Sequence, residues 1–197
     1  MSKNRAIVKQ KPGQIIITDV PVPSLRPGYM LVRTHAVALN PADWTDVDHK
    51  YCCGCVVGLD YAGVVVQIGE RITRSFKPGD RVAGAAYGCN PIHPSDGAFA
   101  QYILVKADLQ MHIPDCMAFE EAASLGVGVL TAGMGLFHEI GLPAPTDSHL
   151  EETLTDQHNN NSWVLIYGGS SATGSIAIQL AKLEVTSSGK MASPCDL

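Results

Sequence analysis

The stretch from Tyr167 to Ser175 has the residue types and spacing of a site for a charged ligand. Residues 164–167 are apolar, and the residues after the stretch place Ile176, Leu180 and Leu183 on one face of a helix. Between them lie Gly168, Gly169, Ser170, Ser171, Ala172, Thr173 and Gly174. Side chains this small let the backbone approach a phosphate, and a helix N-terminus offers free N–H groups to it. The order of strand, glycine-rich turn and helix therefore predicts a site for a dinucleotide pyrophosphate.

The spacing of this turn differs from the usual G-x-G-x-x-G pattern, so a second interpretation stays open. Many turns between a strand and a helix need glycine only for their backbone geometry and bind no nucleotide. The turn alone does not distinguish a nucleotide site from a purely structural turn, so other parts of the sequence are needed.

The first hundred residues contain many short apolar segments separated by glycine and proline. The predicted strands are residues 5–9, 14–19, 30–38, 56–68 and 99–105, with another strand fed by the turn at residues 76–82. This pattern is typical of an all-β, barrel-like domain. From about Phe119 the sequence changes to helices rich in alanine and glycine, which precede the strand, turn and helix described above. The predicted fold is therefore mixed, a β-barrel domain followed by the start of an α/β domain.

Six short motifs occur in a fixed order along the chain. They are residues 40–44 (Asn-Pro-Ala-Asp-Trp), 58–63, 77–82, 96–102, 131–133 and the turn at 168–174. In this order they resemble the medium-chain dehydrogenase/reductase superfamily, whose members join a GroES-like domain to a Rossmann domain. The sequence of residues 167–174 looks most like the fungal trans-acting enoyl reductases, which work beside polyketide synthases that lack a functional reductase domain.

This resemblance implies that the chain divides into three segments. Residues 1–118 would form the GroES-like domain, and residues 119–183 the junction helices and the first strand and helix of an incomplete Rossmann domain. Residues 184–197 form an atypical tail without a clear second strand. We therefore expect a C-terminally truncated member of the family with little or no turnover.

The resemblance also implies a reaction, in which a hydride passes from NADPH to the β-carbon of an α,β-unsaturated polyketide thioester carried by the acyl carrier of the synthase. The cofactor-binding residues implied are Asn40, Asp43, Thr45, Thr131, Gly168, Gly169, Ser170, Ser171, Ala172 and Thr173. The substrate-binding residues implied are Leu130, Thr131, Ala132, Gly133, Met134, Gly135, Leu136 and Phe137. Several relatives carry lysine where Thr45 stands, so a cation is lost here. No catalytic residue is assigned.

Without the resemblance, simpler roles are favoured for three of the singled-out residues. Asn40 and Pro41 are common in turns and could simply close a strand. Asp60 is expected to be a packing or turn residue. The Thr131 hydroxyl could form its hydrogen bond within its own apolar helix.

A zinc ion is not expected. Zinc sites use Cys, His and carboxylates, whereas Asn40, Pro41 and Leu59 stand where the zinc-dependent relatives carry ligands. Cys52, Cys53 and Cys55 lie close together, but no second pair of ligands follows at zinc-site spacing. Free thiols in a loop are the favoured interpretation of these cysteines.

Composition excludes several other classes of function. The formal net charge is −5 and the chain has no basic stripe, so no nucleic-acid partner is expected. The N-terminus has no apolar segment typical of a signal peptide, which predicts a cytoplasmic protein. The uncharged run at residues 122–137 is shorter than the roughly 20 apolar residues that cross a bilayer, so no membrane association is expected.

Three functions remain open from the sequence. The chain resembles an NADPH-dependent enoyl reductase, but the shared motifs also occur in quinone and enone oxidoreductases of the same superfamily. A non-catalytic GroES-like interaction module is the third interpretation.

Overall fold

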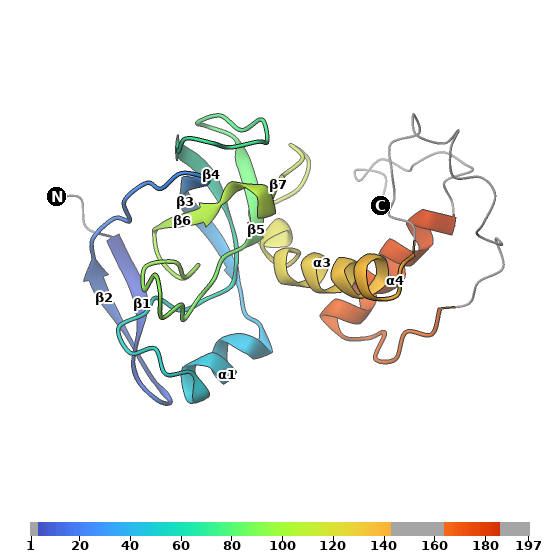
Figure 1. Cartoon of the computed structure of the whole chain (residues 1–197), viewed down its shortest axis with the longest axis horizontal. Coiled ribbons are helices and arrows are strands. Elements are labelled where there is room, and N and C mark those ends of the chain that lie inside the picture. Colours follow the sequence, from blue (N-terminus) through green and yellow to red (C-terminus); the bar gives the residue numbers. More distant parts are fainter. Residues whose placement is uncertain (1–3, 143–163, 186–197) are drawn as a thin grey trace. The chain divides into compact units, whose positions relative to one another are not determined.

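The computed structural model describes residues 4–142 and 164–185, and divides into two compact units after Val127 (Figure 1). The first unit contains the strands and two helices, and the second is helical over the residues described. Each unit is treated by itself below. In the part of the chain that is described, no helix is long and apolar enough to cross a membrane.

The first unit is built on a five-stranded antiparallel sheet with the order β6-β3-β4-β5-β7. Its strands are β3 (Tyr29–Ala38), β4 (Asp60–Ile68), β5 (Arg81–Ala85), β6 (Tyr102–Lys106) and β7 (Gln110–His112), with the 3₁₀ turn η1 (Ala107–Leu109) between the last two. A hairpin of β1 (Asn4–Lys11) and β2 (Gln14–Val20) forms a separate two-stranded sheet. Single bridges from Ala6 to Ala100 and from Val8 to Val56 join the hairpin to other segments of this unit.

The strands of this sheet are buried on both faces over part of their length. Met30 and Val32 of β3 and Tyr61 and Val65 of β4 are buried in one core cluster, where Ile103 of β6 joins them. Residues two apart lie on the same face of a strand, so each strand contributes one apolar row to this core. The predicted strands at 5–9, 14–19 and 30–38 are confirmed within two or three residues. The predicted run 56–68 is shorter as a strand, because Val56 forms only the single bridge to Val8.

The charged side chains buried in the first unit include one lysine. Lys9 of β1 is 0 % exposed, and its ammonium donates hydrogen bonds to the carbonyl oxygens of Asp46, at 3.0 Å, and Lys50. Both carbonyls belong to the last turn of helix α1 (Pro41–His49) and its C-cap. The C-terminal end of a helix presents unpaired carbonyl groups and partial negative charge, so a cation is stabilised there.

The second unit packs two helical segments together. Helix α2 (Phe119–Ala123) belongs to the first unit, and α3 (Gly126–Gly133) continues into the π-helical turn η2 (Met134–Glu139). Ala132 and Leu136 pack against Ala177 of helix α4 (Ala172–Val185). Gly128 allows close approach, since a Cβ atom there would lie 2.4 Å from the Ile176 side chain. The predicted helices in both places are confirmed.

The strand predicted at residues 164–167 is not formed in the described structure. Val164 and Ile166 pack into the helical core, whereas Leu165 and Tyr167 are 93 % and 100 % exposed. A strand requires a neighbouring strand to bond its N–H and C=O groups, and no described segment of this unit pairs with these residues. Residues 164–167 nevertheless alternate in burial, so that one face of this segment is packed and the other is exposed.

Candidate cofactor and substrate site

The N-terminus of α1 brings together two of the predicted cofactor-binding residues. Asn40 is the N-cap, and Pro41 occupies the first helical position, where its missing N–H costs nothing. The Asp43 side chain reaches back, so that its Oδ2 accepts a hydrogen bond of 2.7 Å from the backbone N–H of Asn40. The Asp43 N–H in turn donates to the Asn40 carbonyl at 3.0 Å. This cap fixes the direction in which the chain enters α1.

The Asn40 side chain does not complete the cap but bonds to Asp60 at the start of β4. Its Nδ2 donates to Asp60 Oδ2 at 2.9 Å, while Asp60 Oδ1 accepts a hydrogen bond of 2.7 Å from the N–H of Val127. Asp60 is 1 % exposed. A single buried carboxylate therefore joins the cap of α1, the first residue of β4 and the first turn of α3.

Gly126 makes this arrangement possible by its lack of a side chain. A Cβ atom at Gly126 would lie 2.4 Å from the Gly84 carbonyl oxygen and 2.5 Å from Asp60 Oδ1. The first turn of α3 can therefore sit directly against β5 and against the carboxylate. Sequence reasoning favoured a packing or turn role for Asp60 and missed these two hydrogen bonds; the available signal was a carboxylate that opens an otherwise apolar strand.

Burial controls the electrostatics of the two carboxyl groups. It raises the pKa of Asp43, opposed by the hydrogen bond from Asn40 and reinforced by the nearby Asp60 carboxylate. Burial also raises the pKa of Asp60, against the hydrogen bonds from Asn40 and Val127. Asp43 Oδ1 has no hydrogen-bond partner among the described residues. The backbone N–H of Leu59 also acts on this carboxyl group and opposes the effect of burial on its pKa.

The other predicted residue of α1, Thr45, is turned toward its own helix. Its hydroxyl donates to the Pro41 carbonyl at 2.9 Å, a common hydrogen bond of a threonine to the preceding turn. The neighbouring Trp44 and the preceding Leu39 are both exposed. Thr45 is itself exposed, and its hydroxyl is used within the helix.

The predicted substrate-binding residues divide between two faces of α3 and η2. Leu130, Gly133, Met134 and Phe137, with Val129 and His138, line an apolar groove of about 440 Å³. Ala132 and Leu136 are buried against α4 and do not line it. Thr131 and Gly135 are also absent from the groove lining. The groove can accept an apolar chain along the exposed face of the helix.

The turn before α4 keeps part of the predicted phosphate site. Gly168 has φ +79°, and a Cβ atom at Gly174 would lie 2.2 Å from the Gly168 carbonyl oxygen. The Ser171 hydroxyl is used within the turn, because it donates to the Gly168 carbonyl at 2.8 Å and accepts from the Gly174 N–H at 3.0 Å. The hydroxyl of exposed Ser170 and the first N–H groups of α4, those of Ala172 and Thr173, remain as donors for an anion.

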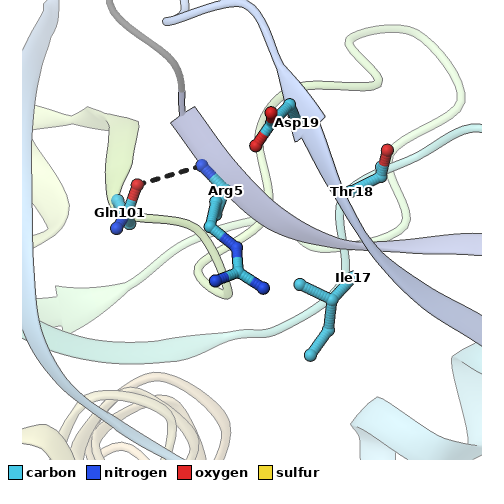
Figure 2. A pocket seen from close by; sticks show the side chains of 5 residues that line it. All are labelled: Arg5, Ile17, Thr18, Asp19 and Gln101. Atoms are coloured by element: carbon cyan, nitrogen blue, oxygen red, sulfur yellow. Dashed lines mark hydrogen bonds between the residues drawn. The ribbon is translucent and has the colours of Figure 1, made fainter.

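A second hollow, of about 600 Å³, lies on the β1–β2 hairpin and contains none of the predicted residues. Figure 2 shows its lining side chains, which are Arg5, Ile17, Thr18, Asp19 and Gln101. The Arg5 N–H donates to Gln101 Oε1 at 3.1 Å. Within residues 4–142 and 164–185, no group of three His, Cys, Asp or Glu side chains is placed to hold a metal ion.

Replacing Asp43 by asparagine should shift the pH dependence of stability. A carboxyl group whose pKa is raised in the folded state favours folding when protonated, and this advantage is lost as pH rises through the folded pKa. The asparagine side chain would keep an oxygen for the Asn40 N–H without a charge. Thermal unfolding should therefore show D43N gaining in Tm relative to the wild type between pH 4 and pH 7. If the difference in Tm between D43N and the wild type stayed constant from pH 4 to pH 7, burial would not raise the pKa of Asp43.

Replacing Asp60 by alanine should destabilise the first unit. The change leaves the Asn40 amide and the Val127 N–H as partly buried donors without their acceptor, which costs about 1–3 kcal/mol in the free energy of unfolding. Urea unfolding measures this cost. Asp108→Ala is the matched control, since exposed Asp108 accepts one hydrogen bond from Thr73 and its loss should cost less than about 0.5 kcal/mol.

Comparison with known proteins agrees with this fold. Residues 26–115 match the alcohol dehydrogenase GroES-like domain. The chain is 48 % identical to trans-enoyl reductase resD of Aspergillus sclerotiorum over 91 % of this chain and 51 % of that protein. It is 46 % identical to trans-enoyl reductase TOXD of Cochliobolus carbonum over 93 % of this chain and 59 % of that protein. The chain thus spans about half the length of the curated relatives it matches.

The chain is also similar in structure to a solved oxidoreductase. The quinone oxidoreductase from Coxiella burnetii matches with a TM-score of 0.69 at 26 % identity, over 93 % of this chain and 55 % of that chain. The likeness extends beyond the GroES-like residues into the helical unit, as the order of the six motifs predicts. The chain therefore carries an alcohol dehydrogenase GroES-like domain and is similar to fungal trans-enoyl reductases and to a quinone oxidoreductase, in agreement with its resemblance to the medium-chain dehydrogenase/reductase superfamily.

Proposed function

We propose that this chain carries the nicotinamide-facing and acyl-binding residues of an NADPH-dependent, trans-acting enoyl reductase of polyketide biosynthesis. The observation that carries the proposal is its identity of 46–48 % to two trans-enoyl reductases over more than nine-tenths of its length. The apolar groove on α3 and η2 supports an acyl substrate, because a hydrocarbon chain gains free energy by burial against such a surface.

The residues described fit a dinucleotide cofactor in two places. The open turn at Gly168 and the first N–H groups of α4 suit a diphosphate, since a helix N-terminus attracts anions. Ser170, Ala172 and Thr173 would supply the donors, whereas the Ser171 hydroxyl maintains the turn itself. Asn40 and Asp43 would lie along the nicotinamide end, at the capped N-terminus of α1. When bound, NADPH supplies the hydride.

The chain's own residues would then orient the substrate. Leu130, Met134 and Phe137 would hold the acyl chain, and Gly133 keeps the groove open because it has no side chain there. The thioester would arrive on the acyl carrier of a partner synthase. We assign no general acid and no zinc ion to this reaction.

A quinone or enone oxidoreductase of the same superfamily is the second candidate. The likeness to the Coxiella burnetii quinone oxidoreductase favours it, because this likeness also covers more than nine-tenths of the chain. The two candidates differ in the ligand that the groove should accept. An enoyl thioester needs room for an acyl chain, whereas a quinone is a compact ring.

Filling the groove should weaken thioester binding. Calorimetry with crotonyl-pantetheine should show binding to the wild type, and Gly133→Leu should weaken it at least tenfold, because the leucine would occupy the groove. Gly135→Leu is the matched control: no atom lies within 4 Å of a Cβ there, and Gly135 does not line the groove. Binding of benzoquinone but not of the thioester would favour the second candidate.

The position of Trp44 allows a direct test of NADPH binding. The chain has two tryptophans, so Trp163→Phe leaves Trp44, next to Asp43, as the single donor of fluorescence. Added NADPH should quench Trp44 emission and increase nicotinamide emission, more strongly than NADH does. The double variant lacking both tryptophans should lose the transfer. No transfer in a folded W163F protein would contradict the placement of the nicotinamide beside α1.

A further inference from the structure

Three buried thiols lie together behind the C-terminal end of α1. Cys52, Cys55 and Cys89 are free and buried, and all three belong to the main core cluster of the first unit. Cys53, which lies between the first two in sequence, is free and exposed. Neither the candidate cofactor residues nor the acyl groove includes any of them.

A tight turn holds Cys52 and Cys55 close to each other. The Cys55 N–H donates to the Cys52 carbonyl at 3.2 Å, and Gly54 supplies the positive φ of +85° that the turn requires. Such a four-residue turn brings the Cα atoms of its ends within 7 Å. Disulfides span Cα separations of about 4.4–6.8 Å. The backbone therefore already has a geometry that a Cys52–Cys55 bridge can use.

Strand β1 fixes this turn in place. The Gly54 N–H donates to the Lys9 carbonyl at 2.8 Å, and the Lys9 N–H donates to the Cys55 carbonyl at 3.0 Å. The Lys9 ammonium lies close enough to lower the pKa of both Cys55 and Cys89, although burial, the larger effect, raises them to about 11 and about 12. The Cys52 thiol is a near neighbour of both. Asp46 and Lys50 are further charged groups near Cys89.

Cys89 is the less suitable partner for Cys52. It has φ +54°, a conformation that few residues other than glycine adopt, and its N–H donates to the Val56 carbonyl at 2.9 Å. Its backbone is therefore held by a contact that a bridge to Cys52 would have to respect. Cys55 shares a turn with Cys52, and a bridge between them would replace the hydrogen bonds of the Cys55 thiol to the Asn90 carbonyl at 3.3 Å and of the Cys52 thiol to the Lys50 carbonyl at 3.8 Å.

We infer that Cys52 and Cys55 are an oxidisable dithiol that closes to a disulfide within the folded first unit. The oxidant is a small disulfide such as oxidised glutathione. One S–S bond forms between Cys52 and Cys55, the two thiol protons and two electrons pass to the oxidant, and two molecules of reduced glutathione are released. Because exchange requires a thiolate, burial makes this reaction slow at neutral pH.

The test is peptide mapping after oxidation of the native chain. The protein is incubated with oxidised glutathione at mildly alkaline pH, alkylated in denaturant and cut with trypsin. Cys52, Cys53 and Cys55 then lie in one peptide, residues 51–71, and Cys89 in another, residues 82–106. The first peptide should lose two hydrogen atoms and take one alkyl group. In Cys53→Ser it should still lose two hydrogen atoms and take none.

Two controls separate the folded geometry from mere proximity in sequence. Cys55→Ser should abolish the loss of hydrogen, whereas protein oxidised in denaturant should show bridges among all three thiols of the peptide. Three alkyl groups on the native oxidised peptide, glutathione held on Cys53 alone, or a cross-link between the two peptides would each overturn the assignment of the Cys52–Cys55 pair. None of these readouts depends on cofactor binding or turnover.

Discussion

The first unit depends on the burial of the Asp60 carboxylate. Removing this group from water is costly, and the cost is offset only because both oxygens accept hydrogen bonds, from the Asn40 amide and the Val127 N–H. These donors come from segments that are far apart in sequence. Their shared acceptor therefore sets where the cap of α1 lies relative to Val127, and Gly126 provides the space for that contact.

The same constraint determines how the neighbouring Asp43 behaves. Its carboxylate caps α1 through the Asn40 N–H, but it lies near the negative charge of Asp60 and away from water. One oxygen is paired and the other is free among the described residues. The Asp43 carboxylate therefore serves the cap of α1 although burial raises its pKa, and the Asn40 N–H opposes that rise. The placement of the nicotinamide remains part of our proposal.

Patterns with local causes could be predicted from the sequence, and contacts between distant segments could not. A short apolar segment after a proline–glycine turn located β3, and the apolar period of Ile176 and Leu180 located α4, because each pattern lies within one element. The strand expected at residues 164–167 failed, since a strand depends on a neighbour that local sequence does not specify. The same holds for the residues of the candidate site. The cap at Asn40 involves neighbouring residues only, whereas the hydrogen bonds of Asp60 join distant segments. Packing against α4 likewise decides that Ala132 is buried while Leu130 lines the groove.

Lys9 has a consequence for how the hairpin reaches its place. A one-residue slip of β1 would move the ammonium to the opposite face of the strand and leave the carbonyls of Asp46 and Lys50 without their donor. It would also bring Val8 or Gln10 toward the end of α1, and neither carries a positive charge. The apolar residues of β1 would tolerate several alignments, but the buried cation permits one. The hydrogen bonds of the Lys9 ammonium thus specify the register of β1 against its neighbours.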